Sequence, residues 1–149
     1  MTTQDSLTLL RRGLLVLLVI GAIGVVGELI LLEHYEDKAQ FIPFGLMALT
    51  LVVTAWHWVD GKKRSLRAFQ AIMLMLVVAG PTGILLHLKG NYEQEREFDP
   101  SVLGLDLWIE VLHGEAPILA PGTLVQFGLL GLLYAYRHPA LTNKDEKDA

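Results

Sequence analysis

Four long apolar stretches occupy most of this chain, and short segments that carry most of its charges separate them. A bilayer core about 30 Å thick requires roughly 20 mainly apolar residues in a helix that rises about 1.5 Å per residue. The stretches run from about residue 13 to 32, 41 to 59, 68 to 88 and 118 to 136. We therefore predict an all-α polytopic membrane protein built as a four-helix transmembrane bundle.

The composition agrees with this class, because 52% hydrophobic and 19% charged residues make the chain too apolar for a soluble protein of its length. The absence of cysteine excludes disulfides and thiolate metal sites. The first stretch is too long for a signal-peptide core and no small-residue cleavage pattern follows it, so we predict an uncleaved helix. Residues 1–142 are predicted to form one membrane domain, and the polar segment 143–149 a disordered cytoplasmic tail.

Lysine and arginine predict the orientation, because short cytoplasmic loops retain positive charge. Nine of these residues fall on the side predicted to hold both termini: Arg11, Arg12, Lys62, Lys63, Arg64, Arg67, Arg137, Lys144 and Lys147. Only Lys38, Lys89 and Arg96 fall on the other side. We therefore predict an integral protein of a bacterial inner membrane, with both termini in the cytoplasm and a strongly acidic outer face.

Glu28 is an ionisable residue inside the first apolar stretch, where charge costs about 2.5 to 3.5 kcal/mol on insertion scales. It shares a helical face with Gly21 and Gly24, and such small residues allow helices to approach closely. The third stretch places a glycine pair in the same relation to His87. Glu28 and His87 are therefore predicted to point into the bundle near its outer end, although Glu28 also suits a purely packing role.

The segment between the third and fourth stretches is predicted to contain a short amphipathic helix, from about residue 101 to 113. Asp106, Glu110 and His113 fall on one of its faces, and most of its other residues are apolar. Trp108 suits the headgroup zone, so the helix is predicted to lie in the outer interface.

Histidines and carboxylates on the predicted outer side suggest a ligand site. The metal candidates are Glu28, His34, His87, Glu110 and His113. Imidazole and carboxylate are ligands for divalent transition metals, and a pair of neutral imidazoles can hold a haem. The alternative is a solvated acidic face with incidental histidines, since the residues come from different segments and show no motif spacing.

His57 is the cofactor candidate on the cytoplasmic side. It shares a face of the second stretch with Thr50 and Thr54 and is flanked by Trp56 and Trp58. Aromatic residues around a histidine can accommodate a porphyrin or chlorin ring. The alternative is the ordinary belt of tryptophan at a membrane interface.

The chain contains no phosphate-binding glycine loop, nucleophile elbow or zinc-protease motif, so no catalytic residue is assigned. The basic charge matches the positive-inside pattern and predicts no nucleic-acid binding. Two functional hypotheses remain. The first is a non-enzymatic membrane subunit that docks to a larger membrane complex or to itself through its glycine-lined faces; the second is a metal or haem protein that uses the outer cluster.

Overall fold

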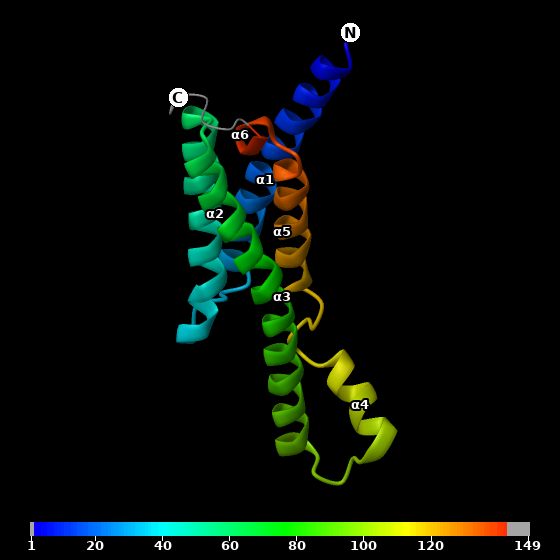
Figure 1. Cartoon of the computed structure of the whole chain (residues 1–149). Helices are drawn as coiled ribbons and strands as arrows, with labels where there is room; N and C mark the ends of the chain where they lie inside the picture. Colours follow the sequence, from blue (N-terminus) through cyan, green and yellow to red (C-terminus); the bar gives the residue numbers. More distant parts are fainter. Residues whose placement is uncertain (1, 143–149) are drawn as a thin grey trace. The chain divides into compact units, whose positions relative to one another are not determined.

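The computed structural model describes residues 2–142, which form helices and turns with no strand in that range. Figure 1 shows the helices in order along the chain. They are α1 (Thr3–Leu31), the short 3-10 helix η1 (Lys38–Gln40), α2 (Phe41–Asp60), α3 (Lys63–Phe98), α4 (Gly104–His113), α5 (Gly122–Ala135) and α6 (Pro139–Thr142). The predicted tail, 143–149, lies outside the described residues.

Three helical segments are long and apolar enough to cross a membrane: α1, α2 together with η1, and α3. They contain the first three predicted stretches and support the prediction of a membrane protein. The helix predicted from 101 to 113 is also present, as α4, although it begins three residues later.

α5 is shorter than the stretch predicted from 118 to 136. Its 14 residues span about 21 Å, less than the bilayer core. Pro117 and Pro121 have no backbone N–H to donate, and residues 117–121 form turns before the helix begins at Gly122. These three spanning helices therefore do not by themselves establish a four-helix bundle.

Two helices extend well beyond their apolar cores. α1 begins at Thr3 because Thr2 and Asp5 form a capping box, in which each side chain accepts a hydrogen bond from the other residue's backbone N–H. α3 continues for ten mainly polar or charged residues beyond Leu88, about 15 Å, and ends at Phe98. Glu, Gln, Lys and Arg are good helix formers, so the end of an apolar stretch does not end a helix.

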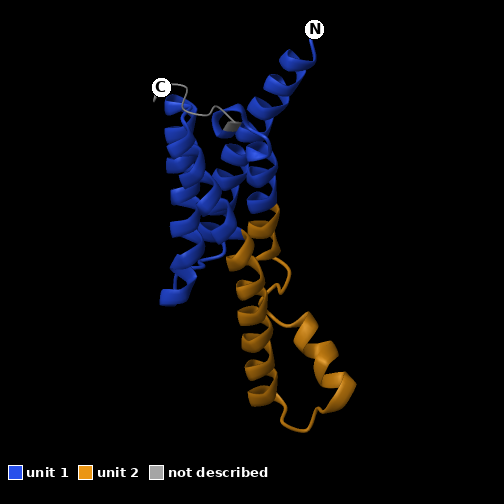
Figure 2. Cartoon of the chain, viewed as in Figure 1, with its two compact units in different colours: residues 1–76, 127–149 blue, residues 77–126 orange. Residues whose placement is uncertain are grey.

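The described chain divides into two compact units (Figure 2). Unit 1 comprises residues 2–76 and 127–142, and unit 2 comprises residues 77–126. The core of unit 1 consists of large apolar side chains from four helices: Leu18, Met47, Leu66, Phe69, Met73, Leu76 and Tyr134.

Glycines allow close packing within each unit. A Cβ atom at Gly131 would collide with the Met73 side chain in unit 1. In unit 2, a Cβ at Gly83 would meet the Pro121 ring at 2.7 Å. The packing role predicted for the glycine pair of the third stretch therefore holds at Gly83, whereas Gly131 was not among the predicted positions.

Candidate functional site

A buried polar cluster in unit 1 surrounds His57, near the end of α2. Only 2% of His57 is exposed, and Ser65, in the first turn of α3, is fully buried. The two residues are brought together by a tight turn at Gly61, which adopts φ 61° and donates its N–H to the His57 carbonyl at 2.9 Å. Glycine suits this left-handed conformation because it has no Cβ.

The hydrogen bonds around Ser65 define the protonation of His57. The Ser65 hydroxyl donates to the Lys62 carbonyl at 2.9 Å, so its oxygen accepts from His57 Nδ1 at 3.0 Å. His57 Nδ1 therefore carries a proton. Thr50 and Thr54 are buried on the same face of α2, as predicted, and each hydroxyl donates to a carbonyl one turn earlier.

His138 approaches His57 from the segment after α5. Their ring centroids lie 5.3 Å apart with the rings at 71°. The Ala140 N–H donates to His138 Nδ1 at 3.2 Å, and Nε2 lies 3.2 Å from the Tyr134 hydroxyl. Burial, together with the nearby His57 and Arg11, lowers the pKa of His138 from 6.5 to about 4. At neutral pH His138 is therefore uncharged, with its proton on Nε2.

Arg11 of α1 completes this end of unit 1. Its guanidinium donates to the Arg137 carbonyl at 3.1 Å and lies 3.5 Å from the Tyr136 carbonyl, beyond the last turn of α5. A cation at a helix C-terminus satisfies free carbonyls and interacts favourably with the helix dipole. Residues from α1, α2, α3 and α5 thus meet at this end of unit 1 through separate hydrogen bonds and through ring contacts.

The chemistry of this cluster favours a structural role over a ligand site. A metal-binding imidazole presents one unprotonated nitrogen and usually donates from the other. His57 has the proton arrangement of such a ligand, but His138 Nδ1 accepts from the backbone, so its Nε2 carries the proton. His138 therefore offers neither ring nitrogen as an unprotonated ligand beside His57.

The aromatic residues around His57 differ from those predicted. Phe69 and Tyr134 lie 6.3 and 5.7 Å away between ring centroids, whereas Trp56 and Trp58 are exposed on α2. The two tryptophans do not line the His57 ring, because neighbouring helical residues point about 100° to either side of it, and their exposure is compatible with the interfacial belt that was the alternative interpretation. The cofactor role of His57 stays a prediction.

The predicted outer metal residues fall in both units. In unit 1, Glu28 is exposed on α1 and His34 is half-buried in the turn after it. In unit 2, His87 Nδ1 donates to the Pro117 carbonyl at 2.9 Å, and His113 Nδ1 donates to the Ile109 carbonyl at 2.8 Å, while Glu110 is exposed. Among residues 2–142, no three His, Asp or Glu side chains are grouped to hold a metal ion. Metal or haem binding by these residues stays a prediction.

The predicted interior position of Glu28 is wrong for the single chain. The buried residues of α1 are Leu15, Leu18 and Ala22. Gly24 follows Ala22 by two positions, or about 200° around the helix, and a Cβ there would meet nothing within 4 Å. Glu28 lies near Gly24 on that open side. Gly21, which was predicted to share a face with Gly24 and Glu28, differs from them because it packs against Phe127 inside unit 1.

Asn91 is the main residue that sequence reasoning missed. It is 98% buried in unit 2, where its amide donates to the carbonyls of Val111 at 3.0 Å and Ala116 at 2.9 Å. Its carbonyl oxygen accepts from the Ala116 N–H at 2.9 Å. A Cβ at Gly114 would lie 2.5 Å from the Asn91 side chain, so glycine is needed for this contact. Asn91 therefore fixes the end of α4 to α3.

Comparison with known proteins gives no match to this chain, either among protein-family models or among curated proteins and solved structures.

Proposed function

We propose that this chain is a non-enzymatic membrane subunit that assembles laterally, with another membrane protein or with a second copy, through the outward face of α1. The single observation that carries the proposal is the exposed position of Glu28 within the apolar part of a membrane-spanning helix. A carboxylate facing lipid is unfavourable, and contact with a partner helix removes that cost.

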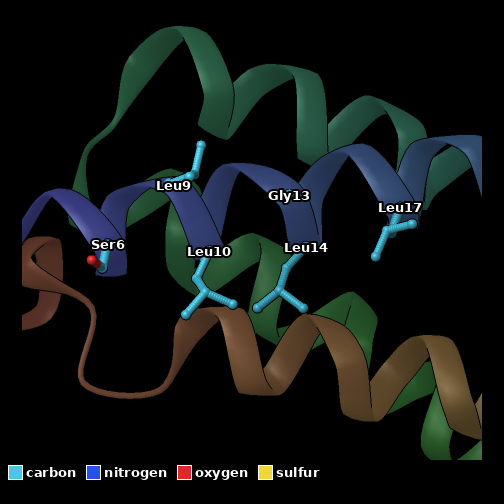
Figure 3. Close-up of a pocket in the computed structure, with 6 residues that line it drawn as sticks. All are labelled: Ser6, Leu9, Leu10, Gly13, Leu14 and Leu17. Carbon is cyan, nitrogen blue, oxygen red and sulfur yellow. The ribbon is translucent and has the colours of Figure 1, made fainter. Parts of the chain in front are cut away.

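The rest of this face supports close contact between helices. Gly13, Gly24 and Gly27 all have open space where a Cβ would stand. A surface hollow of about 420 Å³ occupies the first half of the helix (Figure 3). It is lined by Ser6, Leu9, Leu10, Gly13, Leu14 and Leu17. The outward face of α1, which we define by Gly13, Leu17, Gly24, Gly27 and Glu28, thus lies opposite the buried stripe of the same helix.

Lateral assembly is tested by cysteine cross-linking, because the chain contains no cysteine of its own. A Gly24→Cys variant in native membranes is expected to form cross-links to a partner or to a second copy. A cysteine at Val52, an exposed position on α2, provides the matched control and is expected to form few. Equal cross-linking at both positions would contradict a specific role for α1.

Glu28 itself is expected to determine the strength of assembly. Glu28→Gln keeps a hydrogen-bonding side chain, so it should retain most of the complex. Glu28→Leu should weaken association, by about ten-fold for a loss of 1.4 kcal/mol. The populations of free and assembled protein in detergent or nanodiscs measure this effect. An unchanged assembly in Glu28→Leu would leave Glu28 without a role at the interface.

The proposed arrangement includes a fourth crossing, formed by α5 together with the turns that precede it. The carbonyls of Pro117, Leu119, Ala120 and Pro121 accept i to i+3 hydrogen bonds, and five residues at the 3-10 rise add about 10 Å to the 21 Å of α5. The combined length matches the bilayer core. This crossing supports the proposed four-helix bundle, and the distribution of lysine and arginine supports the proposed position of both termini in the cytoplasm, at a bacterial inner membrane.

Single cysteines at exposed positions test this topology. Lys62→Cys and Tyr136→Cys are expected to react with a membrane-impermeant reagent from the cytoplasmic side, and Glu97→Cys from the outer side. Labelling of Tyr136→Cys from the same side as Glu97→Cys would show that α5 does not cross.

A further inference from the structure

Helix α4 has three distinct faces. One packs within unit 2 through Leu107 and Val111, which are buried. The second is polar and carries Asp106, Glu110 and His113. The third is apolar and exposed. At about 100° per residue the centres of these faces lie roughly a third of a turn apart, so packing inside unit 2 leaves the third face open.

The exposed face of α4 is built from large side chains: Leu105, Trp108, Ile109 and Leu112. Leu105 is 75% exposed and Phe98, at the end of α3, is 87% exposed. Trp108 is held in place by Tyr92, whose ring centroid lies 5.9 Å away. Contiguous apolar side chains on a surface with a polar border are typical of interaction sites.

The helix that carries this face packs against the polar end of α3. Asn91 holds the last turn of α4 and the segment after it, as described above. Residues 89–98 of α3, alongside α4, include Lys89, Glu93, Glu95, Arg96 and Glu97, and so lie outside any apolar core. The exposed face is therefore presented on a polar helical hairpin.

The border of the apolar face is strongly acidic. Residues 89–115 contain seven carboxylates and only two basic residues. Within the described chain, only one of these carboxylates forms an ion pair, between Glu93 and Lys89 at 3.4 Å. Arg96 is engaged by the backbone, since it donates to the carbonyls of Pro100 and Val102. The remaining negative charge of unit 2 is thus not neutralised locally.

A groove of about 290 Å³ lies on the polar side of α4 and brings part of this charge next to the Phe98 side chain. It is lined by Asn91, Gln94, Glu95, Phe98, Glu110, His113, Gly114 and Glu115. Glu95 and Glu110 contribute carboxylates from α3 and α4, while the Phe98 ring lies at the same groove. A Lys or Arg side chain has both an apolar stem and a cationic head, which match this lining.

We propose that the exposed face of α4 and the adjacent acidic groove form a docking surface for a partner protein whose contact region is apolar and bordered by Lys or Arg. This surface is separate from the outward face of α1, so it adds a second interaction to the proposed lateral assembly. Apolar contacts on Leu105, Trp108 and Ile109 supply contact area, and the carboxylates select a basic partner.

Charge distinguishes this occupant from the two other candidates. A second copy of the chain would bring a second set of unneutralised carboxylates against the first, and like charges oppose such a contact. An anionic lipid surface is opposed for the same reason, so this proposal departs from the position in the outer interface that the sequence predicted for the helix. A basic partner is attracted by every carboxylate on the border of the apolar face.

The test uses the full-length protein in phosphatidylcholine nanodiscs and a synthetic helical peptide with leucine on one face and lysine on the other. A Trp56→Phe, Trp58→Phe background leaves Trp108 as the only tryptophan, so its fluorescence reports on α4. The lysine peptide is expected to bind at least ten-fold more tightly than the same peptide with glutamate in place of lysine. Raising the salt concentration should reduce this difference.

Variants identify the surface involved. Leu105→Ser with Ile109→Ser should weaken binding about ten-fold, and Glu95→Gln with Glu110→Gln should remove most of the preference for lysine. Val59→Ser, at an exposed apolar position on α2, should bind like the parent. Equal affinity for both peptides would overturn the proposal. Quenching of Trp108 by brominated lipid in the absence of peptide would also overturn it, because the face would then lie on the membrane surface. Self-association of the protein that Leu105→Ser abolishes would overturn it too, because the occupant would then be a second copy.

Discussion

Replacing Asn91 by Asp is expected to release α4 from α3 while the remainder of the chain stays folded. The two side chains have the same shape, but a carboxylate cannot donate to the carbonyls of Val111 and Ala116. The change places negative charge at a 98% buried position, opposite two acceptors. Each buried group left without its partner costs about 1 to 3 kcal/mol, so a loss of several kcal/mol is expected in unit 2.

Hydrogen exchange of the backbone amides measures this effect locally. Amides in α4 should exchange much faster in Asn91→Asp than in the parent protein, because opening of the hairpin becomes more frequent. Gln94→Ala provides the matched control. Gln94 lies on the same helix as Asn91, and the change removes its exposed hydrogen bond to Glu115. Its effect should be below about 0.5 kcal/mol. Unchanged α4 protection in Asn91→Asp would show that Asn91 does not hold the hairpin.

The spanning segments were predictable because membrane insertion depends on a property that the sequence shows directly, the length of an apolar run. The ends of the helices were not predictable from that property. Thr2 and Asp5 extend α1 through a local capping box, and α3 continues to Phe98 because its polar residues favour helix outside the apolar core. In α5, Pro117 and Pro121 shorten a stretch whose hydropathy alone predicts a full span.

The candidate site was predictable only in part. His57 is a histidine in an apolar helix, and its shared face with Thr50 was predicted correctly, whereas the burial of that face was not predicted. The residues that complete its surroundings, Tyr134 and His138, lie about 80 positions away, and no spacing rule connects them. Such contacts depend on tertiary packing rather than on local pattern.

The position of Glu28 was predicted incorrectly. Its spacing from Gly21 and Gly24 predicted a packed face, but two glycines on a helix do not specify which side meets the rest of the chain. Ala22 occupies the centre of the buried stripe, and Gly24 lies on the other side. The side that packs is determined by the complementary shape of neighbouring helices, which α1 alone does not show.

The cluster around His57 is expected to make unit 1 less stable in acid. His138 has its pKa lowered to about 4, against 6.5 for the ordinary side chain, so the folded state binds its proton less readily than the unfolded state. The stability contributed by neutral His138 is therefore fully present above pH 6.5 and is lost as the pH falls from 6.5 to about 4. Among the described residues, burial of the ring and the nearby His57 and Arg11 all disfavour the imidazolium form of His138.

Thermal unfolding of the full chain in nanodiscs between pH 7 and pH 4 measures this loss. A decrease in Tm of about 5 °C is expected from His138, after allowance for the solvent screening of a half-exposed group. His138→Asn should reduce that decrease, because an asparagine oxygen accepts from the N–H two residues later and does not titrate. His113→Asn, at an exposed position in unit 2, should follow the parent protein. Parallel pH profiles for the parent and His138→Asn would contradict this role, because the acid-sensitive contact at the end of unit 1 would then reside elsewhere.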